Sequence, residues 1–264
     1  MTTLIPTATA RVFQYEFSDV LRSRWVTLYA LFFFGLTEGL FQFGGTGTGV
    51  LLSLLNVVLI LIPLVGVVFG ALYLYQAREF VELMLAQPVR RGELFAGLYA
   101  GLSLPLAGGF VLGVGVPFLL HGGGGTTLAM LLAVGVLLTL VFVALAFWLA
   151  VRFEDRVRGL AVAVGLWLAG AVLYDGLVLA LVAALSAYPL ERPMIALTLL
   201  NPIDLGRVLL LLHFDVSALM GYTGAVFERF FGSALGTGVS LAALGLWLVV
   251  PLGLGLHRFR RKDF

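Results

Sequence analysis

Six long apolar runs constrain this chain more than any other feature of its sequence. A bilayer core of ~30 Å is crossed by about 20 helical residues, each rising 1.5 Å. Runs of that length extend from Trp25 to Phe43, Leu51 to Gln76, Leu94 to Leu120, Thr126 to Val151, Gly159 to Ala187 and Ser233 to Leu256. The sequence therefore predicts an integral membrane protein with six spans.

The composition favours helices for these spans. Of the 264 residues, 61% are hydrophobic and 11% are charged, whereas a soluble domain carries roughly 25% charged residues. The run LLSLLNVVLILIPLVGVVFGALYLY is apolar on every side, unlike the alternating strands of a membrane barrel. Helices and closed barrels are the structures that satisfy every backbone group in lipid, so we predict an all-α fold. The 33 glycines suit close helix approach.

The basic residues predict the orientation. Sixteen Lys+Arg against fourteen Asp+Glu leave a charge of +2, too small a surplus to indicate nucleic acid binding. The other side holds three basic residues, Arg192, Arg207 and Arg229, all in one connection. The positive-inside rule then places both termini in the cytoplasm. The remaining thirteen lie on the predicted cytoplasmic side: Arg11, Arg22, Arg24, Arg78, Arg90, Arg91, Arg152, Arg156, Arg158, Arg258, Arg260, Arg261 and Lys262.

Residues 1–24 predict a helix that lies on the membrane surface. Phe13, Phe17, Val20 and Leu21 recur at helical spacing with polar residues between them, as in interfacial helices. The alternative is a flank that merely anchors the first span. No basic segment followed by a short apolar core and a cleavage pattern occurs here, so we expect no cleaved signal.

Residues 78–91, between spans two and three, predict a short amphipathic helix on the cytoplasmic side. Arg78 and Glu82 are spaced for an i,i+4 pair. The predicted apolar side comprises Phe80, Leu83 and Met84, and Pro88 ends the helix near Gln87. A plain linker does not need such order, so we expect a docking surface for a cytoplasmic partner. The alternative is a membrane-surface helix with snorkelling arginines.

Three polar residues lie inside the predicted spans: Glu38, Asn56 and Asp175. Intramembrane carboxylates are costly and mark functional sites by default. Counting 1.5 Å per residue from the cytoplasmic ends places Glu38 about 20 Å deep and Asp175 about 24 Å deep. All three fall in the outer half, so they predict a polar vestibule open to the outside or a relay to a partner. Interhelical hydrogen bonds and neutral carboxyl groups are an equally weighted alternative.

Residues 188–232, between spans five and six, are too polar to span and too apolar for a disordered loop. We expect one or two helices on the outer face, partly inserted in the membrane. The motif Asn201-Pro202-Ile203-Asp204-Leu205-Gly206-Arg207 predicts a helix start at Asn-Pro followed by an Asp204–Arg207 ion pair. A contact of these residues with an external partner is the second interpretation.

The whole chain resembles the ABC-2 permease family. The segments AREFVELMLAQPVRRGEL, LLNPIDLGRVLLLL and YEFSDVLRSRW, with the ending FRRKDF, carry this resemblance, and within the family they are most similar to the NosY-type permeases of nitrous oxide reductase maturation. The resemblance implies a single ABC-2 type transmembrane domain over residues 1–264, with the ABC-2 (type V exporter-like) permease fold.

The resemblance also implies partners. ABC-2 permeases form a homodimer bound to two copies of a separate cytoplasmic ATPase, which holds the ATP and Mg, and residues 78–91 would be the coupling helix. NosY-type permeases imply, in addition, an extracytoplasmic partner engaged in supplying copper. The residues expected to carry the coupling are Arg78, Glu79, Phe80, Glu82, Leu83, Met84, Arg90 and Arg91.

No catalytic or cofactor motif is expected on this chain. The glycine-rich runs GGTGTG and HGGGG lack the lysine of a G-x-x-x-x-G-K-[ST] loop, so the ATPase must be another subunit. Cu(I) prefers thiolate and thioether ligands, yet cysteine is absent and the five methionines are scattered. His121 and His257 stand alone in the sequence. We therefore expect no metal site here and any copper on a partner.

Other functions fit parts of the same pattern. A generic ABC-2 exporter of lipid, drug or polysaccharide would show the same topology. A proton-coupled carrier could use Glu38 and Asp175, although such carriers usually show inverted repeats, which are missing here. A scaffold that anchors partners without moving anything is a further alternative. A membrane-embedded enzyme would need paired catalytic groups, and the spans contain none.

Overall fold

The computed structural model describes residues 20, 23–43, 46–86, 89–185, 191–213 and 234–262. Most of the predicted surface helix over 1–24, and residues 214–232 of the outer connection, lie outside these ranges. Every described element is helical: α2 (Arg24–Gln42), α3 (Gly47–Gln76), α4 (Arg78–Leu85), α5 (Arg91–Leu120), α6 (Gly125–Arg152), α7 (Arg156–Leu168), η1 (Ala169–Leu173), α8 (Tyr174–Ala184), α9 (Glu191–Leu199), α10 (Pro202–His213) and α12 (Ala234–Arg261). The all-α prediction is confirmed.

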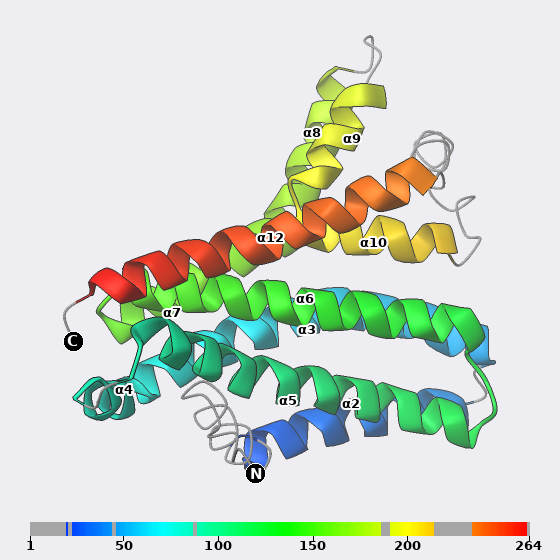
Figure 1. Ribbon diagram of the computed structural model, residues 1–264. Helices are drawn as coiled ribbons and strands as arrows, with labels where there is room; N and C mark the ends of the chain where they lie inside the picture. The colour runs from blue at the N-terminus through cyan, green and yellow to red at the C-terminus, as the bar shows by residue number, and fades with distance from the viewer. Residues whose placement is uncertain are drawn as a thin grey trace, which may run out of the picture.

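Helix α6 is the centre of the bundle. It packs against α3, α5 and α12, whose long axes run nearly side by side with it (Figure 1). Small residues allow the closest crossing, because a Cβ added at Gly70 of α3 would lie 2.6 Å from the Cβ of Ala146 in α6. Such backbone contact is how helices associate in lipid, where apolar area alone gives little preference.

Five described helical segments are long and apolar enough to cross a membrane: Gly47–Gln76, Arg91–Leu120, Gly125–Arg152, Arg156–Ala184 and Gly236–Arg261. They correspond to the predicted spans two to six. The predicted first span is α2, which falls outside that set, although its 19 residues extend ~28 Å. It lies along α5, where Phe33 meets Phe110 at 5.2 Å between ring centroids and Phe41 meets Phe118 at 4.9 Å. Helix α2 thus follows the course of a neighbouring span.

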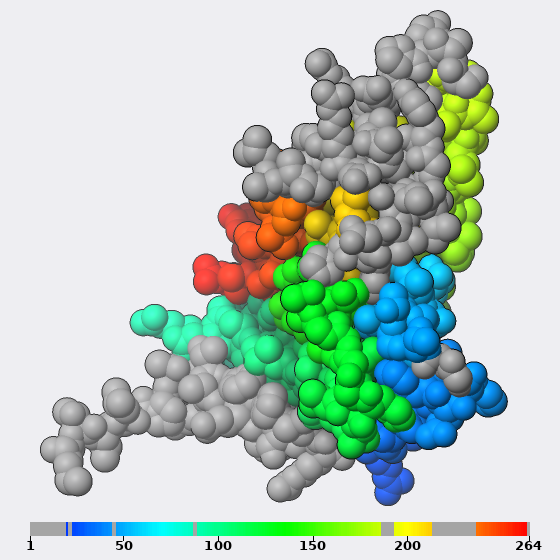
Figure 2. All heavy atoms as spheres, turned by 90° about the vertical axis from the view of Figure 1, so that its right-hand side faces the viewer, coloured from blue at the N-terminus to red at the C-terminus, as the bar shows by residue number. Residues whose placement is uncertain are grey.

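The fifth span is built differently from the others. One turn of π-helix, η1, interrupts it between α7 and α8. Of the most apolar 18-residue stretch of this span, 6% is buried, against 56% for the corresponding stretches of α3 and α6. Its outer part leaves the bundle together with α9 (Figure 1), and the Tyr174 hydroxyl donates to the carbonyl of Leu197 at 2.7 Å. Figure 2 faces the end where α3 and α6 begin and shows α8 projecting beyond them.

Residues 191–213 of the outer connection form two helices, α9 and α10, where the sequence predicts one or two. The paired segments Pro193–Leu199 and Pro202–Leu212 meet at a bend of 111°, and together they are long and apolar enough to form a broken span or a re-entrant loop. Helix α10 lies on α3 and α6, with Gly206 close to Val134 and Leu59. At the bend, the Trp247 indole of α12 donates to the carbonyl of Leu199 at 3.2 Å. The connection is therefore packed on the bundle along α10.

Candidate functional site

Helix α4 stands at the end of the bundle where α3 ends and α5 begins. We call this the basic end, because Arg78, Arg91, Arg152, Arg156, Arg158, Arg258, Arg260, Arg261 and Lys262 gather there. Ala77 is both the C-cap of α3 and the N-cap of α4. The acidic Glu79 in the first turn of α4 complements the positive end of the helix dipole. As predicted, Arg78 and Glu82 pair, at 3.5 Å.

Val81 anchors α4 to the bundle. Its side chain is 1% exposed, beside Leu74 and Tyr75 of α3 and Phe259 of α12. The opposite side of the helix carries Glu79, Glu82 and Leu83, all exposed.

The predicted apolar side of α4 is divided between the bundle and the surface. Phe80 and Met84 are partly buried, whereas Leu83 is 68% exposed and stands beside the two glutamates. Packing of Val81 sets the rotation of the helix and turns Leu83 outward. The exposed side of α4 therefore combines two carboxylates with one large apolar side chain, which is a surface suited to a protein partner.

The two arginines after α4 do different things. Arg90 is exposed and approaches Glu93 at 4.0 Å. Arg91 points to the end of α12, where its Nη1 donates to the carbonyls of Lys262 at 2.6 Å and Arg260 at 3.1 Å. Arg91 thus ties the start of α5 to the end of the last span, and Arg90 remains available to a partner. The predicted helix end at Gln87 and Pro88 lies outside the described residues.

The turn from α6 to α7 completes the basic end. The Tyr75 hydroxyl donates to the carbonyl of Phe153 at 2.9 Å, and the Lys262 ammonium group donates to the carbonyl of Val151 at 3.4 Å. Burial lowers the pKa of Lys262; the carboxylate of Glu154 opposes this effect, and nearby guanidinium groups add to it. These two hydrogen bonds join α3, α6 and the end of α12 at the basic end.

A second polar cluster joins the fifth span to α10. The Arg207 guanidinium lies 2.8 Å from the Asp175 carboxylate and 3.1 Å from that of Asp204. The Asn201 amide donates to the carbonyl of Gly170 in the π-turn at 2.9 Å and to Asp204 at 3.0 Å. One guanidinium is thus shared by two carboxylates, and the irregular turn of the span is held by a side chain of the outer connection. π-Turns of this kind are frequent at functional sites.

The predicted features of the Asn201 to Arg207 motif are confirmed. Helix α10 begins at Pro202, the Asn201 side chain accepts from the backbone N–H of Ile203 at 3.1 Å, and Asp204 pairs with Arg207. The pairing of Arg207 with Asp175 was missed by the sequence reasoning. The two residues are 32 positions apart on different elements, so helical spacing gives no signal for their contact.

The three polar residues of the spans do not come together. Glu38 accepts from Gln42 at 2.8 Å and lies 3.7 Å from the His121 ring at the end of α5. His121 also stacks on Phe41, at 4.4 Å between ring centroids, so its ring joins the end of α5 to α2. Asp175 pairs with Arg207, and Asn56 is exposed on α3. The two carboxylates make separate interhelical contacts, which favours the structural alternative over a shared vestibule.

Metal ligands do not cluster in the part of the chain that the structure describes. No group of three or more His, Cys, Asp or Glu side chains there could hold a metal ion. The absence of a metal site from this subunit stays a prediction.

Comparison with known proteins gives one consistent result. Residues 10–264 match the model of the family described as ABC-2 family transporter protein. A Pseudomonas aeruginosa protein described as "Probable ABC transporter permease protein NosY" is 29% identical over 271 aligned residues, which cover 94% of this chain and 96% of the relative. A Stutzerimonas stutzeri protein of the same description is 27% identical over 265 residues, covering 91% of each.

Proposed function

The chain belongs to the ABC-2 transporter family and is the multi-pass permease subunit of an ABC transporter, and we propose that its α4 transmits ATP-driven movement from a separate cytoplasmic ATPase. The observation that carries this proposal is the exposed side of α4, with Glu79, Glu82 and Leu83. Val81 and the Arg91 contacts fasten α4 and its neighbourhood to three spans. A push on α4 therefore reaches α3 and α5 directly, and α12 through Arg91, as movement of packed rigid helices.

The proposed orientation places the basic end in the cytoplasm. The described arginines that meet at this end are those that the positive-inside rule assigns to the cytoplasmic side. Helix α4 then faces the compartment in which ATP is available. Helices α8 and α9, which project from the bundle together (the α8–α9 projection), would then lie toward the extracytoplasmic side. Arg207 with Asp175 and Asp204 (the Arg207 cluster) would lie toward the same side, where a partner outside the cytoplasm would meet them.

We propose that the transporter contains two copies of this chain. Of the most apolar 18-residue stretch of the fifth span, only 6% is buried within one copy. Asn56 is exposed on α3 at a depth inside the membrane. An unpaired amide in lipid is costly, so a second copy that covers this region would relieve it. ATP hydrolysis is assigned to the partner subunit, which would bind the ATP and Mg; the permease itself would carry out no chemical step.

The proposed cellular role is nitrous oxide reductase maturation, with copper handled by an extracytoplasmic partner. It is supported by the similarity over nearly the whole chain to two proteins named NosY. The Arg207 cluster and the α8–α9 projection offer the surface on which such a partner would act. The ion pairs of Arg207 with Asp175 and Asp204 join elements of one copy. A further contact of this cluster with the partner is what the experiment below tests.

Affinity purification from the native membrane in mild detergent, followed by mass spectrometry, tests these proposals. Recovery of an ATPase and an extracytoplasmic maturation protein in fixed ratio supports them; an ATPase alone points to a general ABC-2 exporter. Glu82→Arg should abolish recovery of the ATPase while the permease still inserts. Arg24→Glu, a charge reversal at the exposed start of α2, is the control that should retain it. Equal recovery with Glu82→Arg would refute coupling through α4.

A further inference from the structure

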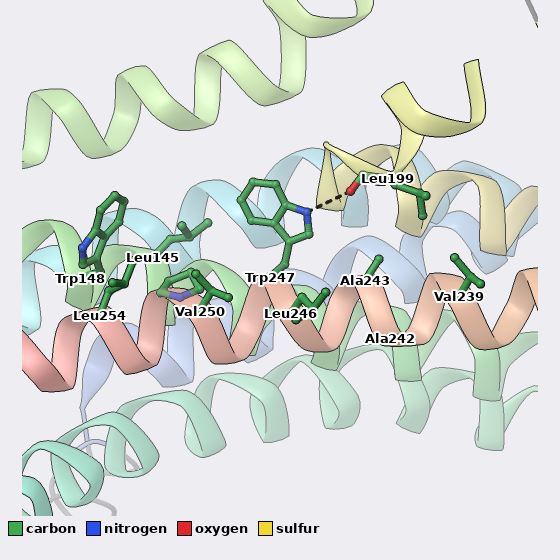
Figure 3. A pocket seen from close by; sticks show the side chains of 11 residues that line it. Leu145, Trp148, Leu199, Val239, Ala242, Ala243, Leu246, Trp247, Val250 and Leu254 are labelled. Atoms are coloured by element: carbon green, nitrogen blue, oxygen red, sulfur yellow. Dashed lines mark hydrogen bonds between the residues drawn. The ribbon is translucent and has the colours of Figure 1, made fainter. Parts of the chain in front are cut away.

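An apolar groove runs along α12 on the outside of the bundle. Its volume is about 620 Å³, and it is lined by Leu145 and Trp148 of α6, by residues of α12 and by Leu199 at the bend of the outer connection. Figure 3 shows the indoles of Trp148 and Trp247 with Leu254, Val250 and Leu246 along it. Leu246 is 62% exposed and Val250 51% exposed, so the groove is open along the membrane-spanning part of α12.

The groove continues into a basic pocket at the basic end. This second hollow has a volume of about 630 Å³ and shares Trp148 and Leu254 with the groove. Its charged lining consists of Arg152, Glu154, Arg258, Arg261 and Lys262. Four cationic side chains therefore face one carboxylate.

The three guanidinium groups of this pocket lack a carboxylate partner in the described structure. Among the described residues, the ion pairs within 4.0 Å all involve other side chains than those of Arg152, Arg258 and Arg261. Guanidinium groups pair strongly with phosphate oxygens, which they can engage through two parallel hydrogen bonds. The pocket thus has the charge of a phosphate site.

We propose that the groove and the pocket together bind one anionic phospholipid, with its phosphate among Arg152, Arg258 and Arg261 and an acyl chain along α12. Basic pockets between membrane helices are typical binding places for anionic head groups, and the partly buried Trp148 stands where the polar and apolar regions of the lipid meet.

The length of the groove fits this ligand. Its lining residues on α12 extend from Val239 to Leu254, which is ~22 Å at 1.5 Å per residue. One leaflet contributes ~15 Å of a hydrocarbon core ~30 Å thick. The groove is therefore long enough to hold the whole of an acyl chain whose head group lies at Arg258.

Charge argues against a second copy of the chain as the occupant. A twofold contact centred on this surface would bring two identical basic pockets toward each other, and like charges across an interface cost several kcal/mol. An anionic lipid neutralises the same groups. The inference depends on the proposed function only for the leaflet, since the proposed orientation places the pocket toward the cytoplasmic leaflet.

The test uses the full chain without ATPase, so its failure leaves the permease assignment untouched. Native mass spectrometry in detergent counts lipids retained from phosphatidylglycerol and from phosphatidylcholine. We expect phosphatidylglycerol to be preferred over phosphatidylcholine by about tenfold or more. That is the factor that corresponds to one charge-assisted hydrogen bond. The double variant Arg258→Gln with Arg261→Gln should remove the preference. Arg156→Gln with Arg158→Gln, two exposed arginines at the same end outside the pocket lining, removes the same charge and should retain it.

A second pair of variants separates the groove from general surface charge. Ala243→Phe fills the groove and should lower retained phosphatidylglycerol about tenfold, whereas Ala96→Phe on the exposed side of α5 should leave it unchanged. Equal loss in both arginine double variants would reduce the binding to bulk charge and overturn the site. Displacement by millimolar inorganic phosphate, or a loss of dimer in Ala243→Phe with lipid retention unchanged, would also overturn it.

Discussion

Truncation of Leu83 to alanine is the sharpest test of docking through α4. Complete burial of a leucine side chain contributes about 1.5–3 kcal/mol relative to exposure. Leu83 is 68% exposed in the permease alone, so about two-thirds of that contribution, ~1–2 kcal/mol, is left for a partner to supply. Loss of this amount weakens binding about 5- to 30-fold. Alanine preserves the helix, and Leu83 does not belong to the hydrophobic core of the described residues.

The assay is equilibrium binding of the purified ATPase to the permease in lipid nanodiscs, read by biolayer interferometry. Leu112→Ala is the matched control, because Leu112 is 63% exposed but belongs to the membrane-spanning part of α5. We expect the control to bind like the unchanged protein. If Leu83→Ala binds within twofold of the unchanged protein, the outward side of α4 is not part of the contact and the coupling assignment fails.

Three further predictions concern the spans. Gly113→Ala should destabilise the permease in detergent by about 1–3 kcal/mol, since the added Cβ would lie 2.6 Å from a backbone oxygen of α2. The control Gly108→Ala has open space around the added Cβ and should melt like the unchanged protein. Equal melting temperatures for the two variants would refute this packing. Arg207→Gln should lower the melting temperature more than Asp175→Asn, because it leaves two carboxylates without their shared cation; the reverse order would contradict the shared arrangement. Glu38→Gln should retain ATPase-driven transport, because Glu38 makes a local interhelical contact; complete loss of transport would restore a proton-carrying role.

The spans were predictable because each depends on a local property of the chain. A run of about 20 apolar residues must be helical in lipid whatever its neighbours are, and the predicted spans two to six agree with the helices within a few residues. The short amphipathic helix and the start of α10 at Asn201-Pro202 also follow from local rules of spacing and helix initiation.

The rotation of α4 was not predictable from its spacing. Phe80, Leu83 and Met84 share one side by helical period, yet Val81 is the residue that the bundle buries. The amphipathic pattern of eight residues allows more than one rotation, and the choice depends on which hollow the neighbouring helices provide. That hollow is built from α3, α6 and α12, which are far apart in the sequence.

The sequence by itself determined the helices of spans two to six and their approximate lengths, because apolar length is a property of a single segment. The side of the membrane for each connection stays a prediction from arginine position. Only the tertiary structure decided which polar residues meet, as Asp175 and Arg207 do, and which surfaces stay open, as on α8 and along α12. The physical reason is that a span is apolar on all sides. Hydrophobic periodicity therefore cannot distinguish a face that touches another helix from one that touches lipid, and shape, small residues and a few polar contacts make that choice.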